Sequence, residues 1–244
     1  MTMAEITPIM LRNVSWHGPR GVEAVSFSLQ PGQFVALTGP SGAGKACLLK
    51  LISRRAPPHL GAVCLFSRDI WLMSEGEVDG TVSVICPDDP QLQDLSPLQI
   101  VDSAWWATSS TVALCRHANA AAALLRQGIA PEDGRQFGEL PLEDRLRVLV
   151  ARVLIRRPPI VLLTHADDPA MLHLQLDLLS ALRGAGATLV AAIEDVAHAR
   201  RMADRVIELD QGHVMRDSVR WPMFQRAASS IWLRGLTAIP FPFE

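Results

Sequence analysis

The chain has 244 residues, of which 49% are hydrophobic and 20% are charged, and its formal net charge is −2 at pH 7. This length and composition fit an ordinary globular protein of one domain, or of one domain with a subdomain, and the small charge gives no indication of a nucleic-acid partner. No apolar stretch reaches the roughly 18 residues that a membrane-spanning helix needs, so we expect no transmembrane segment.

The first part of the chain is predicted to be rich in strands. Residues 8–38 are expected to form antiparallel strands. Within them, the apolar and partly β-branched run 33–38 is expected to be a buried strand that leads into a glycine-rich loop, and a helix over 47–52 follows that loop. Two further short strands are predicted at residues 62–66 and 81–85.

The glycine-rich loop fits seven of the eight positions of the phosphate-binding pattern G-x-x-x-x-G-K-[ST], with Gly39, Pro40, Ser41, Gly42, Ala43, Gly44 and Lys45. Glycines let backbone N–H groups point inward at an anion, and the N-terminus of the next helix faces the phosphates. The eighth position is Ala46, which lacks the hydroxyl that normally ligates Mg²⁺ beside a nucleotide. The pattern therefore predicts a phosphate site without one of its metal ligands.

The second part of the chain alternates helices with short strands. Helical patterns extend over about 96–157, with residues 118–127 as the clearest run of helix formers, and over 170–183. Apolar runs predict buried parallel strands at residues 160–163, 188–193 and 206–209, the last being the final strand. This alternation implies a parallel sheet that is covered by helices through right-handed crossovers.

Three segments, residues 25–45, 144–163 and 186–214, resemble the ATP-binding subunit of ABC transporters, close to its small lipoprotein-release or cell-division type. They resemble, in turn, the family's first strands and phosphate loop, the helix after its signature with the strand before its catalytic acids, and its C-terminal switch strand, helix and hairpin. The resemblance extends over about residues 8–216.

The resemblance implies an α/β fold of the P-loop NTPase class and ABC type. Such a fold has a mainly parallel core sheet, an antiparallel β subdomain and a helical subdomain, here at about residues 88–157. The nucleotide-binding domain would span residues 1–218, and an apolar C-terminal tail would follow at 219–244.

The chain differs from the family at the positions that carry its chemistry. The family ends one strand with an Asp that holds the water shell of Mg²⁺ and a Glu that polarises the attacking water, where this chain has Thr164 and His165. The family's Gln ligand corresponds to Pro87, and its switch His corresponds to Glu194. With Ala46, these residues form a set of degenerate catalytic positions, so we predict no catalytic residue and no metal ligand.

The family's signature Leu-Ser-Gly-Gly-Gln corresponds to Leu140, Pro141, Leu142, Glu143 and Asp144, just before a helix predicted over residues 145–157. In the family, the signature glycines let backbone N–H groups approach the γ-phosphate of the opposite subunit's nucleotide. Leu142 would fill that space, and the two carboxylates that follow would bring negative charge toward a polyphosphate.

These departures together predict absent or very low ATP hydrolysis. Loss of general acid–base catalysis costs about 10² to 10⁴ in rate, and each lost donor at the transferred phosphoryl group costs roughly 10² to 10³, although such effects are not additive. In the family, two domains pair head to tail, and each ATP lies between one phosphate loop and the other chain's signature. In a homodimer, both halves of each ATP site would therefore be altered. In a heterodimer with an intact partner, one half of each ATP site would be altered.

The resemblance implies ATP or ADP as the ligand, with its phosphate charge neutralised by Lys45 and the loop amides. Binding is therefore expected to be weak or independent of Mg²⁺. Trp16 and His17 lie near the family's base-stacking position, and either is a candidate for stacking on adenine. For Trp16, a partly buried strand aromatic is an equal interpretation.

Two further groups have alternative interpretations. His165, Asp167 and Asp168 follow a predicted strand, where α/β proteins place their sites, but their spacing matches no standard set of metal ligands, which favours a solvated loop. Trp105 and Trp106 are adjacent on a predicted helix, so both cannot easily face the core, and one is a candidate for contact with a partner. In the family, this region grips a coupling helix of the membrane subunit.

Three functions fit these observations. The first is a degenerate, non-hydrolysing subunit that docks under an integral membrane subunit, pairs with a second ATP-binding subunit, or does both, and so lies in the cytoplasm at the inner face of the membrane. The second is an active ATP-hydrolysing subunit that energises a transporter through unusual residues. The third is a scaffold outside transport that binds through the apolar tail. ATP turnover separates the first two, and co-purification with a membrane protein separates the third.

Overall fold

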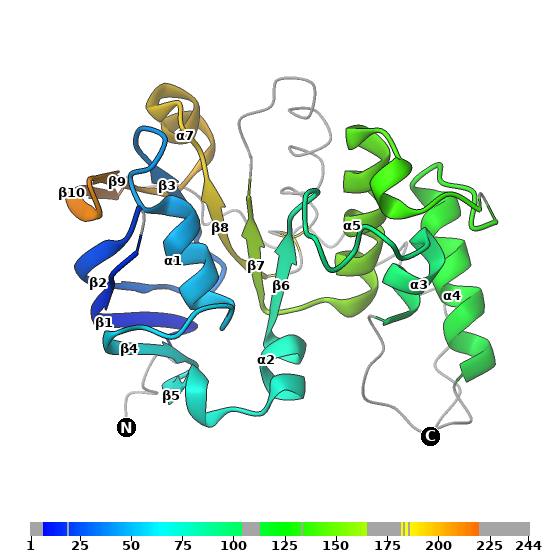
Figure 1. Ribbon diagram of the computed structural model, residues 1–244, viewed down its shortest axis with the longest axis horizontal. Coiled ribbons are helices and arrows are strands. Elements are labelled where there is room, and N and C mark those ends of the chain that lie inside the picture. Colours follow the sequence, from blue (N-terminus) through cyan, green and yellow to red (C-terminus); the bar gives the residue numbers. More distant parts are fainter. Residues whose placement is uncertain are drawn as a thin grey trace.

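The computed structural model describes residues 7–18, 20–103, 113–132, 134–164, 182, 184 and 186–219, with residues 113–116 as backbone only. Figure 1 shows three groups of elements in the described part of the chain: an antiparallel sheet, a larger sheet beside it and a set of helices on the far side of the larger sheet. Several predicted features lie outside the described residues, namely His165, Asp167, Asp168, Trp105, Trp106, the helix over 170–183 and the tail beyond residue 219.

The larger sheet has six strands in the order β10-β9-β3-β8-β7-β6. Its strands are β3 (Phe34–Thr38), β6 (Val82–Ile85), β7 (Ile160–Leu163), β8 (Thr188–Ala192), β9 (Arg205–Asp210) and β10 (His213–Val219). All neighbouring pairs are parallel except β9 with β10. Every residue of β3, β7 and β8 is buried, as expected for short apolar strands in the middle of a sheet that is covered on both faces.

The antiparallel sheet has four strands in the order β2-β1-β4-β5. Its strands are β1 (Ile9–Trp16), β2 (Val22–Leu29), β4 (Leu60–Leu65) and β5 (Arg68–Asp69). In β2, the buried residues Val25, Phe27 and Leu29 alternate with exposed ones. This period of two buries one face of the sheet against α1 and leaves the other face in solvent.

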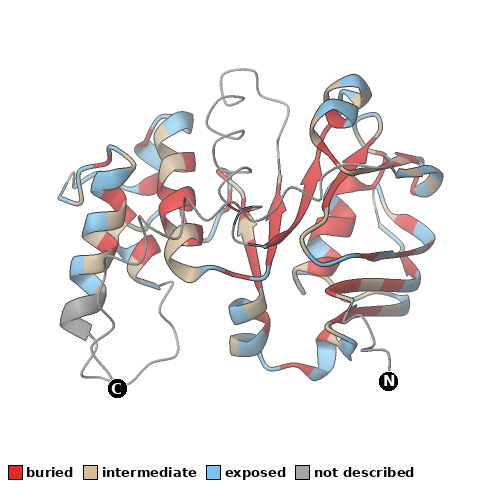
Figure 2. Cartoon of the chain, turned by 180° about the vertical axis from the view of Figure 1, so that it is seen from behind, coloured by how far each residue is buried: buried red, intermediate tan, exposed pale blue. Residues whose placement is uncertain are grey.

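The α-helices in the described residues are α1 (Lys45–Ile52), α2 (Glu75–Thr81), α3 (Pro97–Asp102), α4 (Ala113–Arg126), α5 (Leu142–Arg156) and α7 (Val196–Met202), and the described 3₁₀ helices include η1 (Ile70–Leu72) and η4 (Phe137–Glu139). Ile100 of α3, Leu124 of α4 and Leu149 of α5 are buried in one core cluster, and Figure 2 shows the buried faces of these helices turned toward one another. The three helices therefore pack as a unit at the edge of the larger sheet.

Several predicted elements need correction. The strands over 8–38 are not all antiparallel, because β3 pairs in parallel with β8 and β9. The predicted strand at 206–209 is not the last, because Gln211 and Gly212 both have positive φ and turn the chain back into β10. Helix α5 begins at Leu142 rather than at residue 145, and α2 was not predicted at all.

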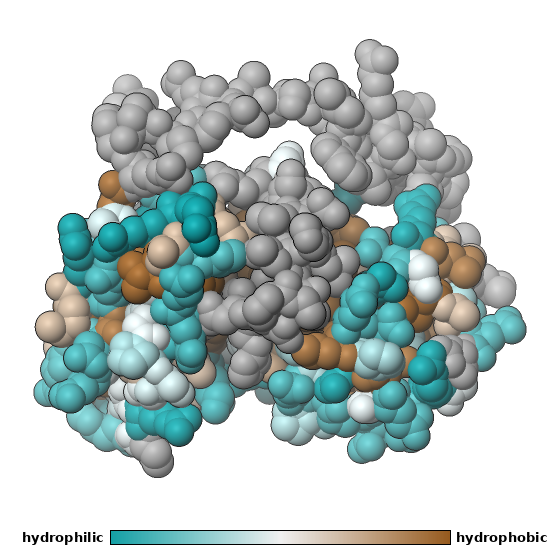
Figure 3. All heavy atoms as spheres, turned by 90° about the horizontal axis from the view of Figure 1, so that it is seen from above, coloured by the Kyte–Doolittle hydropathy of each residue, from teal (hydrophilic) through white to brown (hydrophobic). Residues whose placement is uncertain are grey.

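The described surface is mixed in polarity. Figure 3 shows hydrophilic and hydrophobic residues interspersed on the face seen from above. Among the described residues, no helix is both long and apolar enough to cross a membrane.

Candidate functional site

The glycine-rich loop joins the end of β3 to the start of α1 (Figure 1). Gly39 and Gly44 have φ values of 135° and 105°, in the region that favours glycine. Packing also leaves no room for a side chain: a Cβ on Gly39 would lie 2.0 Å from the carbonyl oxygen of Leu209, and one on Gly44 would lie 2.7 Å from Cγ1 of Val22. The loop is therefore held in its curled form by close contact with β9 and β2.

The start of α1 is arranged to accept an anion. Gly44 caps the helix without a side-chain hydrogen bond, and the first turn contains no acidic residue. The first N–H groups of a helix have no partner within it and carry the positive end of its dipole. Phosphate groups can bind at this helix N-terminus, and the loop from Gly39 to Lys45 would hold them through backbone N–H groups.

Lys45 is surrounded by groups of its own chain. Its side chain is only 9% exposed, and its Nζ donates hydrogen bonds to the carbonyl oxygens of Gly39 and Pro40, the latter at 3.0 Å. The same Nζ lies 3.7 Å from Oε1 of Glu194, whose side chain is 57% exposed. Glu194 comes shortly after β8, the strand next to β3, so the sheet itself brings this carboxylate to the lysine of the loop.

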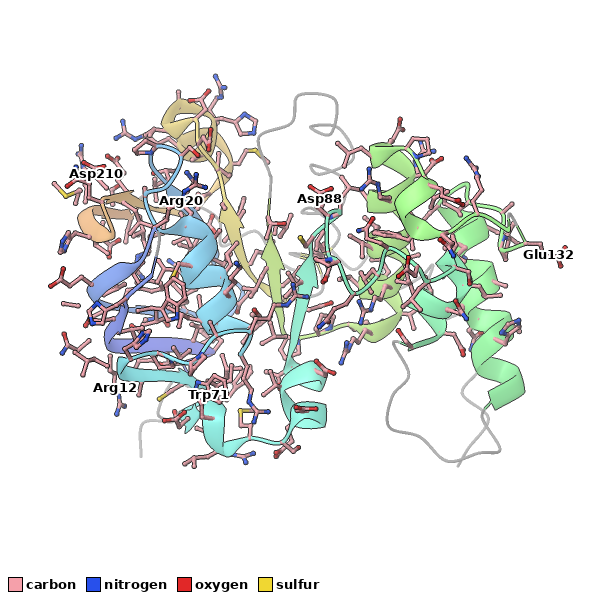
Figure 4. The ribbon with its side chains drawn as sticks, viewed as in Figure 1. Arg12, Arg20, Trp71, Asp88, Glu132 and Asp210 are labelled. Atoms are coloured by element: carbon pink, nitrogen blue, oxygen red, sulfur yellow. The ribbon has the colours of Figure 1, made fainter. Side chains whose placement is uncertain are left out.

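Arg20 is a second cation beside the loop, and it was not predicted from the sequence. A Cβ on Gly42 would lie 3.6 Å from Cγ and Cδ of Arg20 and 3.7 Å from its Nε. The arginine side chain therefore lies against the loop, as Figure 4 shows, although Arg20 belongs to the turn between β1 and β2. The sequence alone places Arg20 in a turn before β2. Its position beside the phosphate loop is revealed only by the packing of β2 against that loop.

Three described positions that the resemblance links to metal binding carry neither a carboxylate nor an amide side chain. Ala46 is exposed at the start of α1 and offers only a methyl group. The N–H and Oγ1 of Thr164 both donate to the carbonyl oxygen of Ile85, at 3.1 and 3.2 Å. Pro87 is buried in the segment after β6. Within the described ranges, no group of three or more His, Cys, Asp and Glu side chains could hold a metal ion.

The segment that corresponds to the signature runs into α5. Leu140 is buried, and Pro141 occupies the N-cap position of the helix. Because α5 starts at Leu142, the carboxylates of Glu143 and Asp144 lie in its first turn, where the helix dipole favours negative charge. Both pair with Arg147, the distance from Asp144 being 3.4 Å. These two residues thus have a local role in α5, beyond their place in the signature segment.

Arg145 joins this segment to the one after β6. Its Nε donates to the carbonyl oxygen of Leu140 at 3.1 Å, and its Nη1 donates to the carbonyl oxygen of Pro87 and to Oδ1 of Asp88, both at 3.2 Å. Asp88 lies between β6 and α5 in Figure 4. One guanidinium group therefore holds together two stretches that the resemblance assigns to nucleotide contact.

Trp16 is partly buried at the end of β1. Its ring centroid lies 6.1 Å from that of His59, and a Cβ on Gly18 would lie 2.3 Å from the ring. These contacts agree with the interpretation as a strand aromatic, and stacking on adenine stays a prediction.

Cys47 lies in the first turn of α1, directly after the phosphate loop. Burial raises the pKa of its thiol to about 11, against a smaller opposing effect of the Lys50 charge. The thiol is therefore protonated at neutral pH, which makes it a packing residue rather than a nucleophile.

A parallel sheet with a glycine-rich loop and a helix N-terminus at the end of its central strand defines a P-loop nucleotide-binding protein. The ABC transporter family matches residues 22–170, which is more than half of the chain. The chain belongs to this family as an ATP-binding domain.

The similar proteins agree with this assignment. The chain is 32% identical over 205 residues to the thiamine import ATP-binding protein ThiQ of Chelativorans sp. (strain BNC1), with 81% of each chain covered. It is 27% identical over 212 residues to the cell division ATP-binding protein FtsE of Bacillus subtilis (strain 168), over 83% of this chain and 92% of that protein. The fold matches a dimeric post-hydrolysis state of the ATP-binding cassette MJ0796 bound to ADP and Pi, with a TM-score of 0.70 and 23% identity over 88% of this chain and 100% of that one. The predicted fold class is thereby confirmed.

Proposed function

We propose that the chain is a degenerate ATP-binding subunit of an ABC transporter complex that binds ATP or ADP weakly, without Mg²⁺, and does not hydrolyse it. The similar proteins named for import and for cell division suggest a subunit that works with other chains. We infer that this chain lies at the cytoplasmic face of the membrane through an integral membrane subunit, a second ATP-binding subunit, or both.

The contact between Lys45 and Glu194 carries this proposal. A phosphate group that enters the loop must compete with a carboxylate that is already 3.7 Å from the lysine Nζ. The carboxylate would also repel the phosphate, because both are negative. Weak binding of nucleotide follows from this arrangement.

The lack of metal ligands supports the remainder of the proposal. Ala46 has no hydroxyl, and Thr164 stands where a carboxylate would be needed to hold the water shell of Mg²⁺. Without the ion, the phosphate charge would be neutralised by Lys45, Arg20 and the loop amides. The positions that would polarise water and bind the γ-phosphate in trans are altered as well, so bound nucleotide would serve as a structural or regulatory ligand.

An ATPase assay tests the absence of hydrolysis. The purified chain, alone and together with any co-purifying ATP-binding chain, is expected to release phosphate at the same rate as its Lys45→Ala variant, with and without Mg²⁺. Robust Mg²⁺-dependent turnover that Lys45→Ala abolishes would overturn the proposal. Equilibrium dialysis against ATP with and without EDTA measures binding itself, and we expect equal, weak uptake in the two conditions.

An active ATP-hydrolysing subunit is the alternative, and the 32% identity to an import ATP-binding protein favours it. The same assay separates the two functions.

A further inference from the structure

A cavity of about 70 Å³ lies at the opposite end of the larger sheet from the phosphate loop. Six of its lining residues carry polar side chains: Ser53, Arg55, Asp79, Ser83, Arg152 and Arg156. They come from the segment after α1, from α2, from the first half of β6 and from the last turns of α5. In Figure 1 these parts meet at the lower end of β6, whereas the phosphate loop lies beyond the upper end of α1.

Three arginines converge on this cavity from two separate parts of the chain. Arg152 and Arg156 are four residues apart on α5, so they project from the same face of the helix, and like charges at this spacing repel one another. Arg55 approaches from the segment after α1. The fold therefore brings three positive charges together at one cavity.

The two neighbouring carboxylates, Asp79 and Asp89, offset these three charges only in part. The buried Asp89 pairs with Arg55, and Asp79 is exposed. The described residues provide no hydrogen bond and no ion pair for Arg152 or Arg156, and Nε of Arg152 is buried without a partner. Burial and the nearby charge of Arg156 lower the pKa of Arg152, and these effects outweigh the charges of Asp79 and Asp89, which raise it. An unsatisfied, desolvated guanidinium of this kind is unfavourable unless an anion is bound.

We propose that this cavity binds a phosphate-type oxyanion, either free phosphate or the phosphomonoester headgroup of a lipid. A water needs about 10–15 Å³ of such space, so the cavity has room for the four oxygens of one phosphate group. Guanidinium groups match phosphate oxygens with paired N–H donors, and the hydroxyls of Ser53 and Ser83 line the same space. This site is independent of nucleotide binding and of the function proposed above.

Thermal unfolding tests the site in a Lys45→Ala background, which removes the lysine of the phosphate loop as a source of phosphate binding. We expect about 10 mM phosphate to raise the Tm above that in sodium chloride of equal ionic strength, as mass action requires of a ligand for the folded state. Adding Arg156→Gln should abolish the rise. Adding Arg147→Gln, on the same helix but outside the cavity, should leave the rise intact.

A second variant separates anion binding from a merely structural role. Arg152→Met removes the unpartnered buried charge, so without phosphate its Tm should equal or exceed that of the parent, and phosphate should no longer raise it. If this variant does not fold, Arg156→Gln still decides the matter. The proposal is overturned if phosphate fails to stabilise the parent, or if it stabilises the Arg156→Gln variant equally.

Vesicle sedimentation distinguishes the two sources of phosphate. Binding to phosphatidylcholine vesicles that contain phosphatidic acid, but not to pure phosphatidylcholine, identifies a headgroup if Arg156→Gln abolishes it. Phosphate stabilisation without vesicle binding identifies the free ion. Vesicle binding that Arg156→Gln leaves unchanged would contradict the headgroup form of the proposal.

Discussion

Replacing Glu194 by Gln should tighten ATP binding, because it removes the carboxylate that competes for Lys45. At the 3.7 Å between Nζ and Oε1, Coulomb's law gives roughly 4.5 kcal/mol for an effective dielectric constant of about 20 and about 1 kcal/mol for bulk water. The Glu194 side chain is 57% exposed, so the lower value applies, in agreement with about 0.2–1 kcal/mol for exposed pairs. An energy of about 1 kcal/mol corresponds to roughly fivefold in affinity.

Equilibrium dialysis with EDTA measures this change. The matched control is Glu132→Gln, which removes the same charge from the loop between α4 and α5, far from the phosphate loop (Figure 4). The gain in Glu194→Gln should shrink at high salt, because ions screen an exposed pair. If Glu194→Gln binds ATP no more tightly than Glu132→Gln at low salt, the inference that Glu194 opposes phosphate is refuted.

Four further predictions concern other described residues. Ala46→Ser alone should leave phosphate release unchanged, because the other altered positions remain, and clear turnover in this variant would contradict the set of losses. Arg20→Ala should weaken ATP binding by about two- to fivefold in dialysis, whereas Arg12→Ala, at an exposed position in the middle of β1, should not. Arg145→Met should lower the free energy of unfolding in urea by about 1–3 kcal/mol, because the carbonyls of Leu140 and Pro87 lose a donor, and a loss no greater than that in Arg147→Met would argue against this. Hydrogen bonds from the Ser74 backbone and from Arg68 lower the pKa of Glu77 from 4.5 to about 2. The ionised Glu77 therefore stabilises the fold fully above pH 4.5, and this stabilisation is lost as the pH falls toward 2. The Tm difference between wild type and Glu77→Gln should vanish at acid pH, and a difference that is constant with pH would contradict this prediction.

Local patterns predicted the central strands well. The expected strands at 33–38, 160–163 and 188–193 agree with β3, β7 and β8 to within one residue at each end. These are short, largely apolar runs whose residues are all buried in β3, β7 and β8, and burial on both faces leaves such a run few alternatives.

The missed elements have weak or conflicting local signals. Strand β10 has no fully buried residue, so it shows no apolar periodicity, although the Gln211–Gly212 turn marks the hairpin. Helix α2 contains two glycines and a single buried residue, and the capping box of Ser74 and Glu77 was the signal that could have identified it. The resemblance placed the whole segment 140–144 before the next helix, whereas Pro141 serves as the N-cap of α5 and the helix starts at Leu142.

The candidate site was predictable in its loop but not in its surroundings. The spacing of Gly39, Gly44 and Lys45 predicted an anion-binding loop, because the glycines themselves determine how the backbone of the loop curves. The contacts of Glu194 with Lys45 and of Arg20 with the loop depend on which strands lie side by side, and no local pattern contains that order. The resemblance placed Glu194 at the switch position, but its distance from Lys45 required the structure.

The position of β3 in the larger sheet has a consequence for the order in which the nascent chain folds. Both neighbours of β3 come late in the sequence, as β8 begins at Thr188 and β9 ends at Asp210. The antiparallel partners β1, β2 and β4 are all complete by Leu65, so they can pair soon after they leave the ribosome. The strand that precedes the phosphate loop, by contrast, waits unpaired until most of the chain has been synthesised. The phosphate loop is thus synthesised early, but it reaches its final structure only when the last strands of the larger sheet are in place.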